Sequence, residues 1–180
     1  GPAAGLLELR EGIAKDLGET RGVIVDPESV VVTPGAKPIL FYSILALAQR
    51  GNEVIYPDPG FPIYESMIRF CGATPVPMCF RMENGRFEID FDDLEAKIGE
   101  RTRLLIINSP HNPTGASLDV NQLQELTRLL EKTDAIVLSD EVYSKIVYER
   151  KHLSICSIPG FLERTILLDG FSKAYAMTGW

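Results

Sequence analysis

The chain has 180 residues, of which 45% are hydrophobic and 24% are charged, a composition typical of one globular domain with a well-buried core. This composition excludes a disordered chain and a membrane-embedded one. The formal net charge of −7 and the pI near 4.9 argue against a nucleic-acid partner, because contacts to phosphates need clustered lysine and arginine.

The first fifty residues predict a helix, a short buried strand and a second helix. Leucine and isoleucine recur at helical spacing over residues 6–17, and the glycines within 18–22 close this helix. Residues 30–33 (VVVT) predict a short strand, which Pro34-Gly35 breaks before a helical run over 36–50. A strand followed by glycine and then a helix is typical of a phosphate-binding turn.

The rest of the chain alternates between strand and helix patterns. We expect strands over residues 53–56, 74–80, 103–108, 135–138 and 165–168, and helices over 61–71, 90–98 and 118–130. The run over 103–108 is almost continuously apolar, which indicates a strand buried on both faces. Six strands interleaved with helices predict an α/β fold with a mainly parallel sheet. No GxGxxG motif follows the first strand, so a plain dinucleotide-binding domain is disfavoured.

Cysteine usage and the N-terminal residues indicate the compartment. The three cysteines, Cys71, Cys79 and Cys156, are odd in number and lack a CxxC spacing, so neither a disulfide framework nor a zinc site is predicted. Residues 1–10 have no basic segment followed by an apolar stretch, and therefore no signal peptide is predicted. We expect a cytoplasmic protein that binds no metal, no membrane and no nucleic acid.

Chemically distinctive residues follow four of the six predicted strands. In open parallel sheets, ligands bind outside the carboxyl ends of the strands, where loops lead into helices. We therefore expect these segments to outline one pocket. The four segments are Gly35-Ala36-Lys37, residues 108–115 (NSPHNPTG), residues 140–143 (DEVY) and Ser172-Lys173.

Lys173 and Asp140 are the strongest candidates for chemistry. Lys173 follows a strand and a glycine, so its amine can point from the sheet edge and form a Schiff base with a carbonyl cofactor. A lone lysine is more often a solvated surface residue. Asp140 comes just after the apolar run 135–138, where a carboxylate needs a partner such as a protonated pyridine nitrogen. A cap for a following helix is an equally good interpretation of Asp140.

The other candidates each have an ordinary structural alternative. Asn112 and Tyr143 can donate hydrogen bonds to a phenolate oxygen, but they can equally be a turn residue and a residue at the core edge. The segment Gly35-Ala36-Lys37 lies at a helix N-terminus, whose free amides favour a phosphate, although it can also be an ordinary tight turn. Phe61 can lay its ring on a flat aromatic ligand or simply pack in the core.

Residues 108–115, 139–143 and 172–180 together resemble, in order and spacing, the class I and II aminotransferases of PLP fold type I. The resemblance runs over the whole chain and is strongest to the bacterial and archaeal branch often labelled aspartate aminotransferase. It implies a three-layer α/β/α fold with a mainly parallel sheet and pyridoxal 5′-phosphate as cofactor. It also implies ping-pong amino transfer between an amino acid and a 2-oxo acid, by a homodimer in the full-length proteins.

The resemblance implies a role for each candidate. Lys173 would be the Schiff base and proton carrier, Asp140 the partner of the pyridinium nitrogen, and Tyr143 with Asn112 the donors to the phenolic oxygen. Phe61 would stack on the pyridine ring, although some relatives carry tryptophan there. The implied catalytic residues are Lys173, Asp140 and Tyr143, and the implied cofactor-binding residues are Gly35, Ala36, Lys37, Phe61, Asn112, Asp140, Tyr143, Ser172 and Lys173.

The resemblance also implies two cis peptide bonds and shows one position at which the chain departs from some relatives. The Asp58-Pro59 and Asn112-Pro113 bonds are expected to be cis, as functional X-Pro turns sometimes are. Gly170 stands where some members have a serine that touches the phosphate.

Full members of the family are about twice as long, so the resemblance implies that residues 1–180 are part of the cofactor-binding large domain. The small domain, with the arginine that grips the substrate carboxylate, would lie outside this chain. The final strand of the family's sheet, between its first and sixth strands, would lie outside as well. Its absence would expose two strand edges, and our hypothesis is that the chain alone is inactive and prone to association.

Two alternative functions remain open. One is a PLP-dependent carbon-sulfur β-lyase, because His111 also occurs in that branch and the choice of reaction depends on groups that face the substrate. The other is a non-catalytic PLP-fold fragment. The combined presence of Lys173, Asp140, Asn112 and Tyr143 favours the enzyme.

Overall fold

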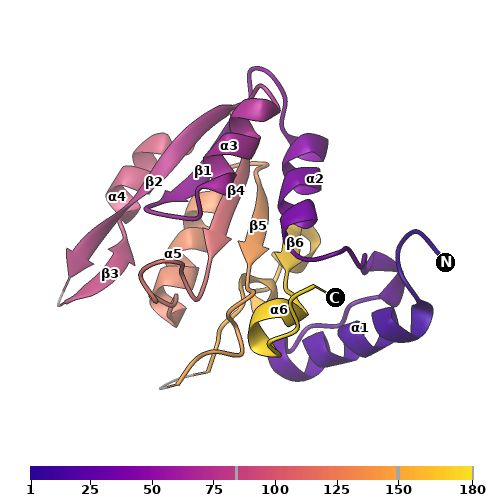
Figure 1. The fold of residues 1–180 in the computed structure, drawn as a ribbon. Helices are drawn as coiled ribbons and strands as arrows, with labels where there is room; N and C mark the ends of the chain where they lie inside the picture. The colour runs from indigo at the N-terminus through magenta and orange to yellow at the C-terminus, as the bar shows by residue number, and fades with distance from the viewer. Residues whose placement is uncertain (84, 149–150, 180) are drawn as a thin grey trace.

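The computed structural model describes residues 1–83, 85–148 and 151–179 (Figure 1). In chain order the elements are α1 (Leu7–Arg21), the 3-10 helix η1 (Pro27–Ser29), α2 (Lys37–Leu47), β1 (Glu53–Asp58), α3 (Ile63–Phe70), β2 (Thr74–Glu83), β3 (Arg86–Ile89), α4 (Phe91–Lys97), β4 (Thr102–Asn108), α5 (Val120–Leu130), β5 (Ile136–Asp140), the 3-10 helices η2 (Ile155–Ser157) and η3 (Leu162–Arg164), β6 (Thr165–Leu168) and α6 (Phe171–Ala174).

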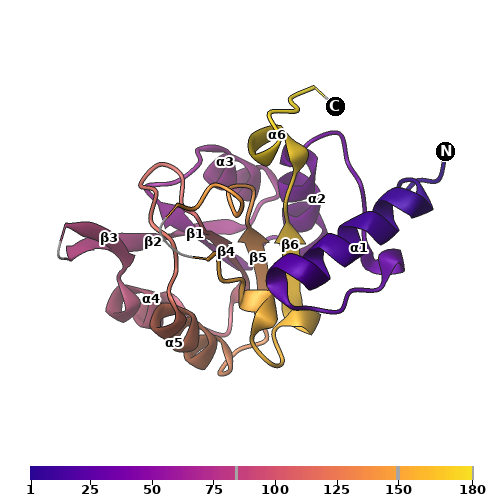
Figure 2. The ribbon, with the colours of Figure 1, turned by 90° about the horizontal axis from the view of Figure 1, so that it is seen from below.

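The described residues form one six-stranded sheet in the order β3-β2-β1-β4-β5-β6. Every neighbouring pair is parallel except β2 and β3, which pair antiparallel. Figure 2 shows helices α2 and α3 on one face of the sheet and helices α4 and α5 on the other. The predicted three-layer α/β/α architecture with a mainly parallel sheet is confirmed.

The two faces of the sheet carry separate hydrophobic cores. On one face, Leu123 and Leu126 of α5 pack with Leu94 of α4 against β4 and β5. On the other face, Ile44 of α2 and Ile68 of α3 pack against alternate residues of the same strands. Burial on both faces explains why β4 is almost continuously apolar.

Local capping sets where helices α4 and α5 begin. The Asp119 side chain accepts a hydrogen bond from the Gln122 amide, while the Gln122 side chain accepts from the Asp119 amide, so α5 starts with a full capping box. The Asp90 side chain likewise accepts from the Asp93 amide at the start of α4. Helix α1 ends at Gly22, which adopts the left-handed conformation that glycine tolerates best.

The predicted strand over residues 30–33 is wrong. This segment pairs with no strand of the sheet within the described residues, and the Val32 amide donates instead to the Ala4 carbonyl at 2.9 Å. An extended apolar run becomes a strand only where a neighbouring backbone supplies the ladder. The sheet's sixth member is instead β3, which the sequence did not predict because it adds only four residues to the edge of β2.

Helix α1 lies beside β6, at the outer edge of the sheet (Figure 2). Leu17 packs with Val23 and Cys156 in a small third cluster, which Leu167 of β6 joins. Over the described ranges, the structure contains no helix of the length and apolarity that a membrane crossing requires.

Candidate active site

Strands β1, β4, β5 and β6 end at one edge of the sheet, called here the carboxyl edge. Asn108 at the end of β4 is the register partner of Asp140 at the end of β5, and Asp140 is the partner of Leu168 at the end of β6. In Figure 1 these three strands run downward, and α6 with Lys173 lies beneath them. The parallel topology therefore brings three of the chemically distinctive segments together at the carboxyl edge. These are the segments after β4, β5 and β6.

Asp140 is the most deeply buried of the predicted site residues. It is 6% exposed, its Oδ2 accepts a hydrogen bond of 2.7 Å from the Tyr64 hydroxyl, and its Oδ1 accepts from the Val142 amide at 3.4 Å. Burial raises the pKa of Asp140 to about 6, although the Tyr64 and Val142 donors favour the ionised form. Among the described residues, no cation pairs with this carboxylate.

The helix-cap interpretation of Asp140 is wrong, because the segment after β5 forms turns rather than a helix. The side chain that holds Asp140 is Tyr64, which sequence reasoning missed. Tyr64 lies in α3 and is 1% exposed, and burial beside the carboxylate raises the pKa of its hydroxyl. The signal in the sequence was a tyrosine at an apolar position of an amphipathic helix, where a buried hydroxyl needs a partner.

Asn108 ties the loop after β4 to the end of β5. Its Nδ2 donates to the Asp140 carbonyl at 2.9 Å, and its Oδ1 accepts from the Asn112 amide at 2.8 Å. The loop carries cis bonds before Pro110 and Pro113, of which the second was predicted. Asn112 is therefore held beside Asp140 through a buried amide to which the sequence had assigned no role.

Phe61 lies in the loop between β1 and α3, next to Tyr64. The two rings meet edge to face, with centroids 5.9 Å apart, and Lys37 Nζ lies 5.9 Å from the centroid of Phe61. The Asp58-Pro59 bond is cis, as predicted. Gly60 leaves no room for a side chain, because a Cβ there would lie 2.1 Å from the Pro57 carbonyl oxygen.

The start of α2 brings Gly35, Ala36 and Lys37 to the carboxyl edge. Gly35 has a φ of 87°, and its carbonyl accepts a hydrogen bond of 2.7 Å from the Thr33 hydroxyl. Ala36 is the N-terminal capping position, and no side chain caps this helix. The first turn can therefore offer backbone amides and the positive end of the helix dipole to an anion.

Lys173 and Tyr143 lie close together at the carboxyl edge, where their side chains reach solvent. Lys173 Nζ is 5.9 Å from the centroid of the Tyr143 ring, and Lys173 is exposed while Tyr143 is half-buried. Ser172 shares the short helix α6 with Lys173, and Gly170 precedes this helix in an extended conformation. Since Lys37 is exposed as well, the four segments outline an open face rather than a closed pocket.

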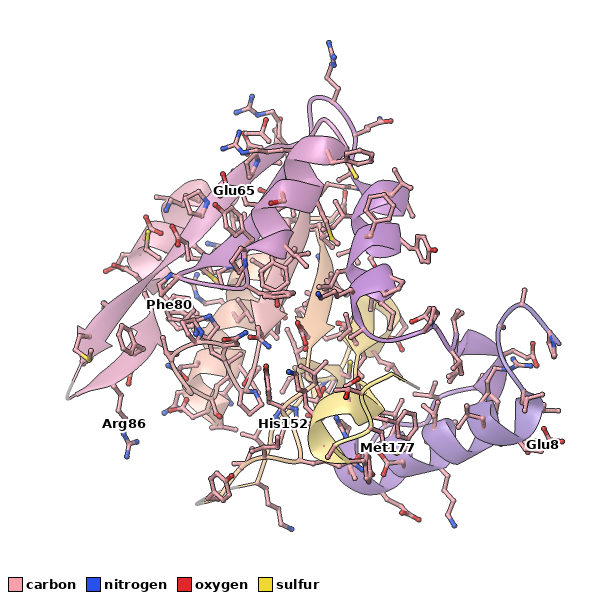
Figure 3. The ribbon with its side chains drawn as sticks, in the orientation of Figure 1. Glu8, Glu65, Phe80, Arg86, His152 and Met177 are labelled. Atoms are coloured by element: carbon pink, nitrogen blue, oxygen red, sulfur yellow. The ribbon has the colours of Figure 1, made fainter. Side chains whose placement is uncertain are left out.

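His111 is a buried residue of the loop after β4. It is 4% exposed, its ring stacks on Phe80 with centroids 4.5 Å apart, and its Nδ1 lies 2.7 Å from the Thr114 hydroxyl. Burial lowers the pKa of His111 to about 4, so the ring is neutral near pH 7. Phe80, labelled in Figure 3, comes from β2. His111 therefore acts as a packing residue of the loop in this structure.

The sequence and the structure of this chain were compared with those of known proteins. The profile of the family described as aminotransferase class I and II matches residues 1–180. The aspartate aminotransferase of Pyrococcus abyssi is 41% identical over 182 residues, which cover 100% of this chain and 46% of that protein.

Two solved structures share the fold closely. The N-succinyldiaminopimelate aminotransferase of Mycobacterium tuberculosis superposes with a TM-score of 0.96 at 35% identity, covering 99% of this chain and 47% of that one. The aromatic aminotransferase of Pyrococcus horikoshii superposes with a TM-score of 0.95 at 42% identity, covering 100% and 48%. The chain thus spans about half the length of the proteins it matches.

Proposed function

Because this chain belongs to the class I and II aminotransferase family, we propose that its carboxyl edge is the cofactor-binding part of a pyridoxal-phosphate-dependent aminotransferase. The observation that carries the proposal is the buried Asp140 carboxylate, which ends β5 with no cation beside it among the described residues. A buried carboxylate without a cationic partner is costly unless a ligand supplies the charge.

The residues of the carboxyl edge fit this cofactor in four respects. Asp140 offers an anion for a protonated pyridine nitrogen, and Phe61 offers an aromatic ring beside Tyr64, the residue that donates to Asp140. The uncapped start of α2 offers amides for a phosphate. Lys173 is exposed beside Tyr143 and offers an amine for a Schiff base.

When bound, pyridoxal phosphate supplies an electron sink for the negative charge left at the substrate α-carbon. The chain's own residues would bind and orient the cofactor and move the proton. Asp140 would keep the pyridine nitrogen protonated through its negative charge, and Asn112 and Tyr143 would donate hydrogen bonds to the phenolic oxygen. Lys173 would hold the cofactor through its amine, and the same amine would serve as the base that accepts the proton from the substrate α-carbon. Lys37 and Ser172 would bind the phosphate group of the cofactor together with the backbone amides at the start of α2.

The proposal extends to the whole protein. Residues 1–180 would be part of the cofactor-binding large domain, with amino acids and 2-oxo acids as substrates and a homodimer as the assembly. The relatives carry names with three different substrates, aspartate, N-succinyldiaminopimelate and aromatic amino acids, so the proposal names the reaction class and not one substrate. A cytoplasmic location is proposed because the three cysteines are unpaired.

The test is selective modification of Lys173. The chain would be mixed with pyridoxal phosphate, its visible absorbance recorded, and the mixture reduced with borohydride before peptide mapping by mass spectrometry. We expect one dominant adduct on Lys173, lost in Lys173→Ala and kept in the matched control Lys15→Ala, whose lysine pairs with Glu19 on the surface of α1. Equal labelling scattered over many lysines in all three proteins would refute the proposal.

A further inference from the structure

We propose that Arg21 and Glu141 form a buried positioning pair that fixes the backbones carrying Asp140, Tyr143 and Lys173 relative to one another. The inference rests on the proposed function of those three residues and extends it to two residues that do not reach the open face. Arg21 is the last residue of α1, and Glu141 follows β5 directly. Each side chain is 1% exposed.

The Glu141 carboxylate is saturated by donors from three segments. Oε1 accepts from the Ser139 hydroxyl at 2.9 Å and from the Ser154 hydroxyl at 2.6 Å. Oε2 accepts from Arg21 Nε at 3.2 Å and lies 2.7 Å from His152 Nε2. His152, labelled in Figure 3, lies below the lower end of β5. These donors hold the pKa of Glu141 below its usual range, although burial alone would raise it.

The Arg21 guanidinium links Glu141 to the turn that precedes α6. Its Nη2 donates to the Ser144 hydroxyl at 2.6 Å and to Asp169 Oδ2 at 2.5 Å. Asp169 in turn accepts the Gly170 amide on Oδ1 at 2.7 Å, immediately before the helix that contains Lys173. The backbone amide of Glu141 also donates to the Leu168 carbonyl at 2.8 Å.

Several residues of this network are chain neighbours of the proposed site or of the turn before it. Glu141 is the chain neighbour of Asp140, and Ser144 is the neighbour of Tyr143. Asp169 anchors the turn that leads to Lys173. One guanidinium and one carboxylate thus connect the end of α1 with two strand-end segments, the one after β5 and the one after β6. The planar guanidinium of Arg21 reaches these acceptors from two nitrogens held in a fixed geometry, Nε and Nη2, whereas a lysine ammonium would offer its donors from a single nitrogen on a flexible stem.

The experiment compares Arg21→Met, Arg21→Lys and Glu141→Gln with the matched control Arg10→Met. Arg10 is a second buried arginine of α1, 7% exposed, and its polar contacts go to the Pro27 carbonyl and to Glu28. All variants are studied well below their unfolding temperatures. The first readout is amide hydrogen exchange of residues 168–174 and 140–144. The second is the yield of borohydride-trapped pyridoxal phosphate on Lys173.

We expect exchange in both segments to be faster by about tenfold or more in the Arg21 and Glu141 variants, and unchanged in Arg10→Met. Trapping on Lys173 should fall by about tenfold in the same variants, because a small displacement of a reacting group is costly. Arg21→Lys should not rescue either readout. If Arg21→Met and Arg10→Met perturb both segments equally, the pair is merely structural and the inference is wrong.

The two readouts separate this inference from the proposed function. If the unaltered chain shows no selective trapping on Lys173, the proposed function fails, and hydrogen exchange alone then decides whether the pair positions these segments. If trapping on Lys173 is selective and survives in Arg21→Met and Glu141→Gln, the proposed function stands and the positioning pair does not.

Discussion

The hydroxyl of Tyr64 in α3 donates a hydrogen bond of 2.7 Å to Oδ2 of Asp140 at the end of β5, although the two residues are 76 positions apart. Both side chains are buried, and the bond crosses from a helix on one face of the sheet to the carboxyl edge. It orients the carboxylate and satisfies one of its oxygens. The other oxygen has only the Val142 amide, at 3.4 Å.

Replacement of Tyr64 by phenylalanine removes this donor and keeps the ring. Because the donor stabilises the ionised carboxylate, we expect the pKa of Asp140 to rise further and the free energy of unfolding to fall by about 1–3 kcal/mol at about pH 8. The loss should shrink at about pH 5, where the carboxyl is protonated. Denaturant unfolding at both pH values measures it. Tyr148→Phe, at a position 92% exposed, is the control, and an equal loss in both variants would contradict the assignment.

Asp140→Asn should stabilise the chain while impairing cofactor binding. The pKa of Asp140 rises from 3.8 to about 6 on folding, so the folded chain binds its proton more tightly than the unfolded chain does. The contribution of Asp140 to the free energy of unfolding therefore falls as the pH rises through this window and stays low above it. Relative to the unaltered chain, the variant should gain about 3 kcal/mol between about pH 4 and about pH 7.

The measurement for Asp140→Asn is denaturant unfolding across that pH range, with only the difference between the two proteins interpreted. Asparagine can meet both partners, since its amide can donate to the Tyr64 oxygen while its carbonyl accepts from Val142. A difference that does not vary with pH would show that Asp140 is not a costly buried carboxylate.

Asn108→Ala should loosen the loop that carries Asn112. The substitution removes the acceptor of the partly buried Asn112 amide and one donor to the buried Asp140 carbonyl, which keeps the Ser109 amide at 3.1 Å. We expect the free energy of unfolding to fall by about 2–3 kcal/mol and amide exchange over residues 109–115 to accelerate. Asn121→Ala, at an exposed position of α5, should change the stability by less than about 0.5 kcal/mol. Unchanged exchange in the loop would argue against Asn108 as its anchor.

Gly60→Ala tests the turn that places Phe61. A Cβ at this position would lie 2.1 Å from the Pro57 oxygen, so the backbone must shift and the stability should fall by more than about 2 kcal/mol. Thermal or denaturant unfolding measures the change. The control is Gly12→Ala in the middle of α1, where a Cβ meets nothing within 4 Å and where alanine should stabilise the helix by about 0.5–1 kcal/mol. Equal effects in the two variants would refute this account of the turn.

Much of the fold could be predicted from local patterns. The continuous apolar run of β4 and the helical spacing in α5 each reflect burial of a whole face, which a strand or helix imposes on its own sequence. The strand ends were recognisable because polar residues and prolines follow each apolar run. For the same reason, Lys173, Asp140 and Asn112 could be assigned to one edge of a parallel sheet before any coordinates were known.

Two errors have one physical cause. Residues 30–33 have the composition of a strand but pair with no strand within the described ranges, and β3 is a strand because β2 lies beside it. Strand formation depends on the neighbouring backbone, which short-range periodicity does not contain.

The sequence by itself determined the order of the elements, the mainly parallel sheet and the chemically capable residues at its carboxyl edge, because these follow from hydrophobic periodicity and from the right-handed connections of parallel strands. Only the tertiary structure decided which buried groups meet. Tyr64 holds Asp140 across 76 positions, and Arg21 holds Glu141 across 120. Each pairing joins polar groups that packing removes from water, so the partner is chosen by the fold as a whole and not by the residues nearby in the chain.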